Sequence, residues 1–387
     1  MGEHRLLVKD YTFVVLALLY TFGPLHYVAS FIPTLWSFPA LFVLSKFVWN
    51  AVEDRLSRKR VKSDGKAIFI TGCDSGFGFE LAKRMAGKGF DIYAGCLFPD
   101  GDGAKSLAKT PNIFVEGFDV TKEHSISDAV VRIRERLESD NKYSWTNRRT
   151  KLKYISSGLW GVVANAGIPL LGPFEWCSME DIHRLFDVNV FGVIRTAKAF
   201  IPLLRGSNGR FVITGSVSGV TSYPLLIPYS MSKAAVSSLS EGLRRELGPQ
   251  AKVYFTTILP SFHKTPMLEE CSVKELDKRY LALPEAEREK VSPRYLEKCK
   301  QTHRTVVSVL AISDLTATLK AFDHALTSVR PRPWYICDRP VMLNVLWPIV
   351  HHFPVETTDF MFQEFGKIGN FFKYIFGGGS DSRRTKS

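Results

Sequence analysis

The sequence predicts a doubly wound α/β fold built on a parallel sheet, with a membrane segment before it and an apolar extension after it. Two patterns indicate the sheet. Short apolar runs of strand length alternate with amphipathic stretches of helical period between residues 66 and 260, and a glycine-rich turn follows the first run. A length of 387 residues, 45% hydrophobic and 23% charged, is globular and excludes a coiled coil, a collagen-like repeat or a disordered chain.

The first element is an uncharged amino-terminal segment. No Asp, Glu, Lys or Arg occurs from Tyr11 to Ser45, and about 20 helical residues suffice to cross a bilayer. Prolines interrupt the segment, so we expect either one span with an interfacial stretch or a hairpin of two spans. Basic residues concentrate between residues 46 and 62, and positive charge prefers the cytoplasmic side. The sequence therefore predicts an anchor in membrane lipid, followed by a domain that lies in the cytosol.

The overall charge gives a second reason to expect lipid rather than nucleic acid as a partner. The net charge is +13, but the basic residues are dispersed and do not form a stripe with interleaved aromatic residues. Basic flanks beside an apolar segment are typical of an anionic membrane surface. The six cysteines have neither C-x-x-C nor zinc-ligand spacing, so we expect free thiols and no metal site.

The second element is a strand, a turn and a helix in succession. An apolar run at residues 66–71 leads into the turn T-G-x-x-x-G-x-G at 71–78, and helical spacing follows over 79–87. Glycines let the backbone approach a pyrophosphate, and a helix N-terminus supplies free N–H donors. The residues expected to bind a dinucleotide here are Gly72, Asp74, Ser75, Gly76, Phe77 and Gly78.

The next strand, at residues 91–96, bears on the choice of cofactor. Its carboxyl end should face the adenosine ribose, and no Arg or Lys stands there to hold a 2′-phosphate. Asp74 brings negative charge into the glycine loop, which disfavours an extra phosphate. The sequence therefore predicts NAD, with NADP as the less favoured cofactor.

Further strands are expected at 112–118 and 161–167, with an amphipathic helical stretch over 125–138 between them. Asp119, followed by Val120, either accepts from the adenine amino group or caps the following helix. Asn165, Ala166 and Gly167 either pass beneath the cofactor or form an ordinary turn. Residues 140–157 form a basic insertion, which is either a solvated loop or a membrane contact.

The catalytic candidates come from three separate stretches. Ser216 ends a strand that begins at Arg210, and Tyr229 and Lys233 lie four residues apart on a helix that reaches about residue 247. A lysine beside a phenol favours the phenolate, which predicts a lowered tyrosine pKa and proton exchange with an alcohol or a ketone. Ser216 would hold the substrate oxygen, and Asn189, on an earlier helix, would support a water relay to the lysine.

Together these motifs resemble the short-chain dehydrogenase/reductase family over about residues 65–330. The stretches 71–78, 95–97, 158–161 and 276–326 resemble its membrane-bound branch, which includes retinol dehydrogenases, 17-beta-hydroxysteroid dehydrogenase type 2 and 3-hydroxybutyrate dehydrogenase. The resemblance implies a Rossmann-like fold, a homo-oligomer and NAD-dependent oxidation of a hydroxyl on a hydrophobic substrate. It also implies that Pro260 and Thr265 contact the nicotinamide. This chain departs from the family pattern at Ala164, where an asparagine is usual, and at Ser261, where a glycine is usual.

The substrate end should follow Thr265. Met267 and two charged helical stretches, at 273–280 and 284–302, are expected to close over the substrate, which would also contact Ser216 and Tyr229. His263 is expected to be a loop histidine rather than the catalytic base. Residues 331–376 are unusually apolar and form either core or dimer interface, or a helix on the bilayer. Two membrane contacts around one pocket would let a hydrophobic alcohol or ketone enter from lipid.

The expected organisation is an anchor and basic linker at 1–61, a catalytic domain at 62–330 and an apolar extension at 331–387. The membrane is expected to be the endoplasmic reticulum, with a mitochondrial membrane as the alternative. Three other functions stay open: an NADP-linked carbonyl reductase, a 3-hydroxybutyrate dehydrogenase, and a membrane-anchored dinucleotide-binding scaffold without catalysis.

Overall fold

The structure is a computed structural model, which describes residues 59–139, 144–146, 153–155 and 159–338, with isolated residues at 44, 45, 48, 356 and 359. The predicted anchor and most of the predicted apolar extension lie outside these residues. Among the described residues, no helix combines the length and the apolar character needed to cross a membrane.

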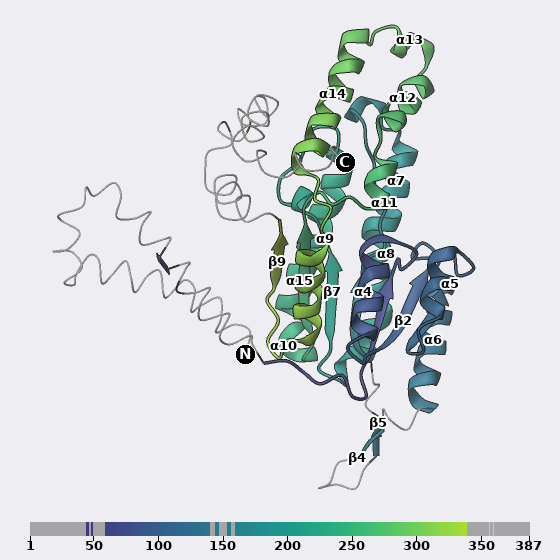
Figure 1. Ribbon diagram of the computed structural model, residues 1–387, viewed down its shortest axis with the longest axis vertical. Coiled ribbons are helices and arrows are strands. Elements are labelled where there is room, and N and C mark those ends of the chain that lie inside the picture. The colour runs from purple at the N-terminus through teal and green to yellow at the C-terminus, as the bar shows by residue number, and fades with distance from the viewer. Residues whose placement is uncertain are drawn as a thin grey trace, which may run out of the picture.

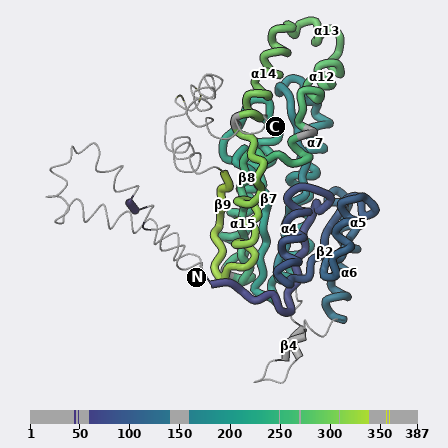
Figure 2. Tube along the Cα trace, viewed as in Figure 1, coloured from purple at the N-terminus to yellow at the C-terminus, as the bar shows by residue number. Residues whose placement is uncertain are grey.

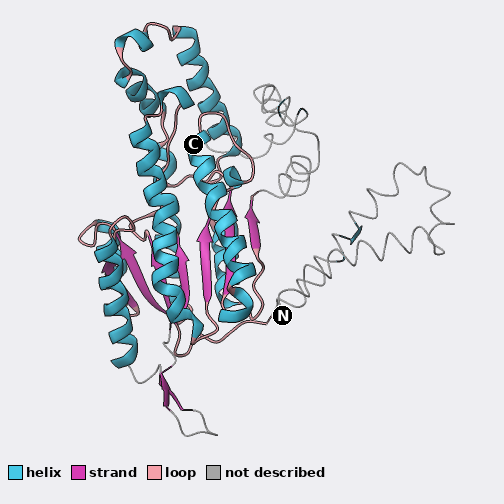
Figure 3. Cartoon of the chain, turned by 180° about the vertical axis from the view of Figure 1, so that it is seen from behind, coloured by secondary structure: helices cyan, strands magenta, loops and turns pink. Residues whose placement is uncertain are grey.

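The predicted doubly wound parallel sheet is confirmed. Seven strands run parallel in the order β3-β2-β1-β6-β7-β8-β9, and in Figure 3 all the strand arrows of the sheet point toward the same helical end. Strands β1, β6 and β7 are buried along their whole length, which is why apolar residues dominate their sequences. The strand bounds are β1 Ala67–Thr71, β2 Asp91–Cys96, β3 Ile113–Gly117, β6 Leu159–Ala164, β7 Arg210–Thr214, β8 Tyr254–Pro260 and β9 Trp334–Cys337.

Helices cover both faces of the sheet (Figure 1). Helices α6, α8 and α9 pack on one face of the sheet, against strand side chains that include Phe69, Val162 and Phe211. Helices α4, α5 and α15 pack on the other face, against strand side chains that include Ile68 and Ile92. These elements have the bounds α4 Gly76–Ala86, α5 Asp102–Ala108, α6 Glu123–Ser139, α8 Gly192–Arg205, α9 Ile227–Glu246 and α15 Thr316–Thr327.

The strand order reverses between β1 and β6. The chain winds outward from β1 to β3, returns to β6 beside β1, and then winds the other way to β9. Ligands of open α/β sheets bind at the carboxyl ends of the strands at such a reversal. The glycine turn after β1 and the 165–167 turn after β6 both lie there.

A second group of helices rises beyond the carboxyl end of the sheet (Figure 2). The two charged helical stretches predicted after Thr265 correspond to these helices, and a separate apolar cluster that includes Leu171, Leu226, Leu276 and Leu310 holds them to the sheet. The remaining helical elements described are α7 Met179–Phe186, α10 Gly248–Ala251, α11 Pro266–Glu270, α12 Val273–Ala282, α13 Glu285–Arg288, α14 Pro293–Leu310, the 3₁₀ turns Phe174–Trp176 and Val217–Gly219, and the π-helix Asp187–Phe191.

The basic insertion contains a short antiparallel pair, β4 (Ser144–Thr146) and β5 (Lys153–Ile155). The sequence predicted a loop or a membrane contact here. Strands of three residues carry too little pattern to be recognised in a basic segment, so this hairpin was missed.

Strand β9 marks where both undescribed segments join the domain. Lys59 and Val61 pair through their backbones with Val329 and Thr327, just before β9 begins, and Arg210 at the start of β7 donates to Ser328 O at 2.8 Å. The amino-terminal segment therefore joins at the edge where the strands begin. The carboxyl-terminal segment leaves after Cys337, at the opposite edge. The expectation that both segments contact lipid around one pocket concerns residues outside the described part of the chain.

Candidate active site

The glycine turn is shaped by contacts that exclude side chains. Gly72 has φ +69°, and a Cβ there would lie 2.8 Å from the Ala166 Cα. A Cβ on Gly78 would lie 2.2 Å from the Gly72 carbonyl oxygen and 2.7 Å from Asn165 Nδ2. Helix α4 begins at Gly76, three residues earlier than predicted, and Ser75 at its N-cap makes no side-chain capping bond. The turn therefore leaves the first amides of α4 available for an anion.

Asn165 joins three strands at the reversal point. Its Nδ2 donates to Thr71 O at 3.1 Å and to Gly72 O at 3.2 Å, and its Oδ1 accepts from Thr214 Oγ1 at 3.1 Å. The Ala166 N–H also donates to Thr71 Oγ1, at 3.0 Å. One asparagine thus supports the backbone below the cavity, although Ala164 stands where the family usually has a second one.

Asp74 reaches from the glycine turn to the end of β2. Its carboxylate accepts the backbone N–H of Leu97 at 3.0 Å and that of Phe98 at 2.8 Å. The sequence showed no acidic residue at the tip of this strand, and Asp74 supplies the negative charge that was missing there.

Asp119 uses its carboxylate within its own turn. Oδ1 accepts from the Thr121 N–H at 2.9 Å and from Thr121 Oγ1 at 2.7 Å, while the Asp119 N–H donates to Ser125 Oγ. Neither Asp119 nor Val120 lines the cavity described below. The contacts therefore favour the structural interpretation, in which Asp119 orders the turn before α6.

The four catalytic candidates converge at the ends of β7 and α9. Lys233 Nζ donates to Thr214 O at 2.9 Å and lies 5.6 Å from the centroid of the Tyr229 ring. Ser216, the last residue before a 3₁₀ turn, accepts the Ser218 N–H at 3.1 Å. Asn189 lies in the π-helix, 1% exposed, and does not reach the cavity surface.

Asn189 instead holds the loop after β6. Its Oδ1 accepts the Ile168 N–H at 2.8 Å, and its Nδ2 donates to Ile168 O at 3.0 Å and to Ser232 Oγ at 3.2 Å. Single-turn π-helices are frequent at functional sites. Here the π-helix places the Asn189 side-chain amide against the backbone at Gly167, which also lies beside Lys233. A Cβ on Gly167 would be 3.2 Å from Asn189 Oδ1 and 3.6 Å from Lys233 Nζ.

Burial dominates the ionisation of the two central groups. It lowers the pKa of Lys233 to about 8, and it raises the pKa of Tyr229 well above its usual value. Cys271 adds to this rise, and the Ser216 hydroxyl, as a hydrogen-bond partner of the phenol, opposes it. The prediction that Lys233 lowers the Tyr229 pKa is wrong for this arrangement, because the ammonium is directed to the Thr214 carbonyl.

A cavity of about 380 Å³ connects these groups. Most of the residues predicted to form the site line it: Gly72, Asp74, Ser75, Gly76, Phe77, Asn165, Ala166, Gly167, Ser216, Tyr229, Lys233, Pro260, Thr265 and Met267. Gly78 lies outside the lining, as do Asn189, Asp119 and Val120. Among the described lining residues, Lys233 is the one Lys or Arg.

His263 makes structural contacts, as expected. Its Nδ1 pairs with Ser261 O at 2.9 Å, its Nε2 pairs with Thr318 Oγ1 at 3.2 Å, and its ring meets Phe77 edge-on. With both ring nitrogens engaged, His263 has no free nitrogen to act as a base.

Sequence reasoning missed the outer wall of the cavity. Thr302, His303, Val306 and Val307, which share one face of α14, line it together with Leu171 and Cys271. The i, i+1, i+4, i+5 spacing of the α14 residues is a signal for one helix face, but the sequence does not tell which structure that face covers.

Comparisons with known proteins agree with this arrangement. The family model for short chain dehydrogenase matches residues 66–276. The mitochondrial D-beta-hydroxybutyrate dehydrogenase of Mus musculus is 33% identical over 77% of this chain and 83% of its own length. The 11-beta-hydroxysteroid dehydrogenase type 2 of Oryctolagus cuniculus is 33% identical over 78% of this chain and 70% of its own length.

A solved structure gives the same fold. A short chain dehydrogenase/reductase from Burkholderia phymatum, in complex with NAD, has a TM-score of 0.56 and 23% sequence identity, and the match covers 74% of this chain and 93% of that chain. At this identity the likeness concerns the fold.

Proposed function

The chain belongs to the short-chain dehydrogenase family, and from this premise we propose that it oxidises a hydroxyl group on a hydrophobic, uncharged molecule, a hydroxysteroid or retinol, with NAD as the hydride acceptor. The observation that carries the proposal is the lining of the cavity. Apart from the catalytic candidates, the wall around Tyr229 consists mainly of Leu, Val, Pro, Phe and Met side chains.

The two relatives named above suggest two substrate classes, a hydroxy acid and a hydroxysteroid, and the lining of the cavity distinguishes between them. A hydroxy acid such as hydroxybutyrate carries a carboxylate, and burying a carboxylate requires a cationic or hydrogen-bonded partner. Lys233 is the one described lysine or arginine in the cavity lining, and its Nζ already donates to Thr214 O. The cavity therefore suits an uncharged substrate such as a hydroxysteroid better than it suits a hydroxy acid.

The residues of the turn fit NAD. Gly72 and Gly78 leave space that a Cβ would fill, and α4 has no side-chain cap at its N-terminus, so a pyrophosphate has both room and N–H donors. Asp74 stands at the end of β2, where a 2′-phosphate would meet its negative charge. The turn suits the pyrophosphate of either dinucleotide, and the Asp74 carboxylate supports NAD over NADP.

The proposed chemistry assigns one task to each catalytic residue. Ser216 donates a hydrogen bond to the substrate oxygen and fixes its position. Tyr229, as phenolate, takes the hydroxyl proton as the hydride leaves the carbon, so that the alcohol becomes a carbonyl. NAD, when bound, accepts that hydride. Burial disfavours this phenolate in the cofactor-free protein, and Lys233, whose Nζ lies 5.6 Å from the Tyr229 ring centroid, would help to stabilise it during the reaction. Asn189 keeps the loop at Ile168 in place and supports the proton relay to the lysine.

The proposal also includes an anchor. Residues 1–61 would hold the catalytic domain, residues 62–330, on the cytosolic side of the endoplasmic reticulum, and the apolar residues after 331 would contact the bilayer or a second copy of the chain. The uncharged stretch from Tyr11 to Ser45 and the basic residues after it support this arrangement. Protease added to intact microsomes should degrade the catalytic domain. Protection of that domain would contradict the orientation.

The test uses membranes that express the full chain. NADH formation at 340 nm is followed with NAD or NADP and with estradiol, testosterone, androstanediol, retinol and 3-hydroxybutyrate. We expect NADH with a steroid or retinol, and loss of the signal in Tyr229→Phe, which retains NAD binding. Activity on 3-hydroxybutyrate alone would replace the proposed substrate class. NAD binding without turnover on any compound would favour the dinucleotide-binding scaffold.

A further inference from the structure

The outer wall of the cavity carries two polar side chains on a surface that is otherwise apolar. Thr302 and His303 lie on the same face of α14 as Val306 and Val307, and all four line the cavity. The neighbouring wall is formed by Leu171, Leu225, Leu226, Leu268 and Cys271. Two hydrogen-bonding groups thus stand within a surface that offers few other polar contacts to a ligand.

His303 is available to bind a ligand. Its side chain is half-buried, and within the described part of the chain it makes no hydrogen bond. Burial, followed by the charge of Arg304, lowers the pKa of His303 below its usual range. The ring is therefore neutral at pH 7, with one nitrogen as donor and the other as acceptor. A neutral imidazole suits a carbonyl or hydroxyl oxygen and gives no charge to attract a carboxylate.

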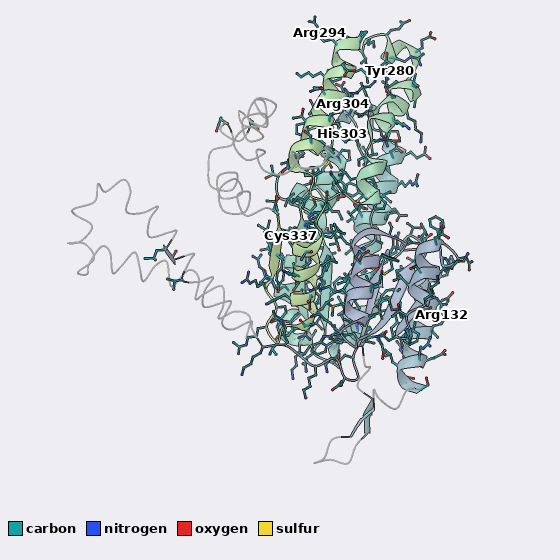
Figure 4. All side chains as sticks on the ribbon, viewed as in Figure 1. Arg132, Tyr280, Arg294, His303, Arg304 and Cys337 are labelled. Carbon is teal, nitrogen blue, oxygen red and sulfur yellow. The ribbon has the colours of Figure 1, made fainter. Side chains whose placement is uncertain are left out.

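The position of His303 follows from the way α14 meets the sheet. The helix ends at Leu310, and the next residues pair with the loop after β8: the Ile312 N–H donates to Phe262 O at 2.8 Å, and the Lys264 N–H donates to Ile312 O at 2.9 Å. His303 lies seven residues before the end of α14, which is about 10 Å along the helix axis. Figure 4 shows the same order, with Arg294 at the far end of α14 and His303 nearer the sheet.

Apolar side chains separate His303 from the catalytic residues. Val306, one turn closer to the sheet, packs in the same cluster as Tyr229, Leu226 and Leu268. A substrate in this cavity can therefore meet Ser216 and Tyr229 beside the sheet, the apolar side chains of this cluster, and the imidazole on the α14 wall.

We propose that His303, with Thr302 beside it, is a second polar subsite, which binds an uncharged oxygen of the substrate at the α14 wall of the cavity, away from the reacting hydroxyl. The proposal rests on the proposed function and deepens it, because it restricts the substrate to alcohols with an oxygen at each end of a rigid apolar body. A dioxygenated steroid has this chemistry. Retinol, which has one oxygen, does not.

The test compares two alcohols that share the reacting hydroxyl and differ only in whether they carry the far oxygen. The ring position of the reacting hydroxyl is taken from the results of the substrate panel. For a 17-hydroxyl the pair is 17β-hydroxy-5α-androstan-3-one and 5α-androstan-17β-ol. In the full-length enzyme, His303→Phe should lower kcat/KM at least tenfold for the first compound and less than twofold for the second. His303→Gln retains a donor and an acceptor and should recover most of the loss. His183→Phe, an exposed histidine on α7 outside the cavity, is the matched control.

The outcomes separate the two proposals. Equal losses on both compounds in His303→Phe, or no loss on either, would overturn the subsite and leave the proposed function standing. A wild-type chain that binds NAD and oxidises neither steroids nor retinol would overturn the proposed function, and the subsite with it.

Discussion

Asp74 and Phe98 are joined by a 2.8 Å hydrogen bond between the Asp74 carboxylate and the Phe98 backbone N–H, although 24 residues separate them in the chain. A second bond, from the Leu97 N–H, reaches the other carboxylate oxygen at 3.0 Å. The glycine turn and the end of β2 are therefore one unit. Its negative charge lies where the adenosine ribose of a dinucleotide is expected.

Replacing Asp74 by Ala should relax the choice of cofactor. Without the carboxylate, a 2′-phosphate meets less repulsion, and the Leu97 and Phe98 N–H groups become free to bind it. We expect the ratio of kcat/KM for NAD to kcat/KM for NADP to fall at least tenfold. Asp100→Ala, which removes an exposed acid near the same strand end, should leave the ratio unchanged. An unaltered ratio in Asp74→Ala would show that the Asp74 carboxylate does not determine the preference for NAD over NADP.

Two glycines should respond in opposite directions to a methyl group. In Gly78→Ala the new Cβ would lie 2.2 Å from Gly72 O, so the turn must shift, and we expect the free energy of unfolding to fall by about 2–3 kcal/mol. In Gly242→Ala, inside α9, nothing lies within 4 Å of the new Cβ, and about 0.5–1 kcal/mol should be gained. Urea unfolding measures both. Equal effects would mean that the contacts of Gly78 are unimportant.

Asn189 should affect both stability and turnover. Asn189→Ala leaves both backbone groups of Ile168 without this partner, which should cost about 2–3 kcal/mol of unfolding free energy. The loop beside Lys233 then loses its support, and we expect kcat to fall at least tenfold. Asn112→Ala is the matched control, because Asn112 also holds two backbone carbonyls, those of Ala86 and Phe90, on the far side of the fold. It should lose stability and keep its kcat.

Lys233 should give stability a measurable pH dependence. Below pH 8 the lysine is charged in both the folded and the unfolded chain. Between its folded pKa of about 8 and the ordinary value of 10.5, the unfolded chain binds more protons, so the free energy of unfolding rises with pH. Lys233→Met lacks this contribution. Between pH 7 and pH 10 the wild type should gain up to about 3 kcal/mol relative to the variant. Parallel pH profiles of the two cofactor-free proteins would contradict the lowered pKa.

The parts of the fold that were predicted correctly depend on neighbours in the sequence. Residues 91–96 were predicted as a strand and form one with the same bounds, because a buried parallel strand is apolar on both faces. The glycine turn and the pairing of Tyr229 with Lys233 on one helix are also local patterns. These features required only the spacing of residues along the chain.

The parts that were missed depend on distant contacts. The bond from Asp74 to Phe98 requires the positions of two loops that are built separately. The place of His303 depends on how α14 docks on the loop after β8, and its residue type gives no sign of that docking. The direction of the Tyr229 pKa was wrong because burial, which the sequence does not display, raises it, and because the Lys233 ammonium is directed to the Thr214 carbonyl.

The two ends of β9 have a mechanical consequence. A body held at one point can tumble in any direction, whereas a body held at two points can only swing about the line that joins them. The first described residues of the domain, at 59–61, pair with residues 327–329, which precede this strand, and the domain ends just after the strand, at residue 338. In the alternative in which both terminal segments contact the bilayer, the domain would swing about an axis roughly parallel to β9. Strand β3, six strands away and about 29 Å from that axis, would travel farthest, while Ser216 at the end of β7, two strands from β9, would move much less.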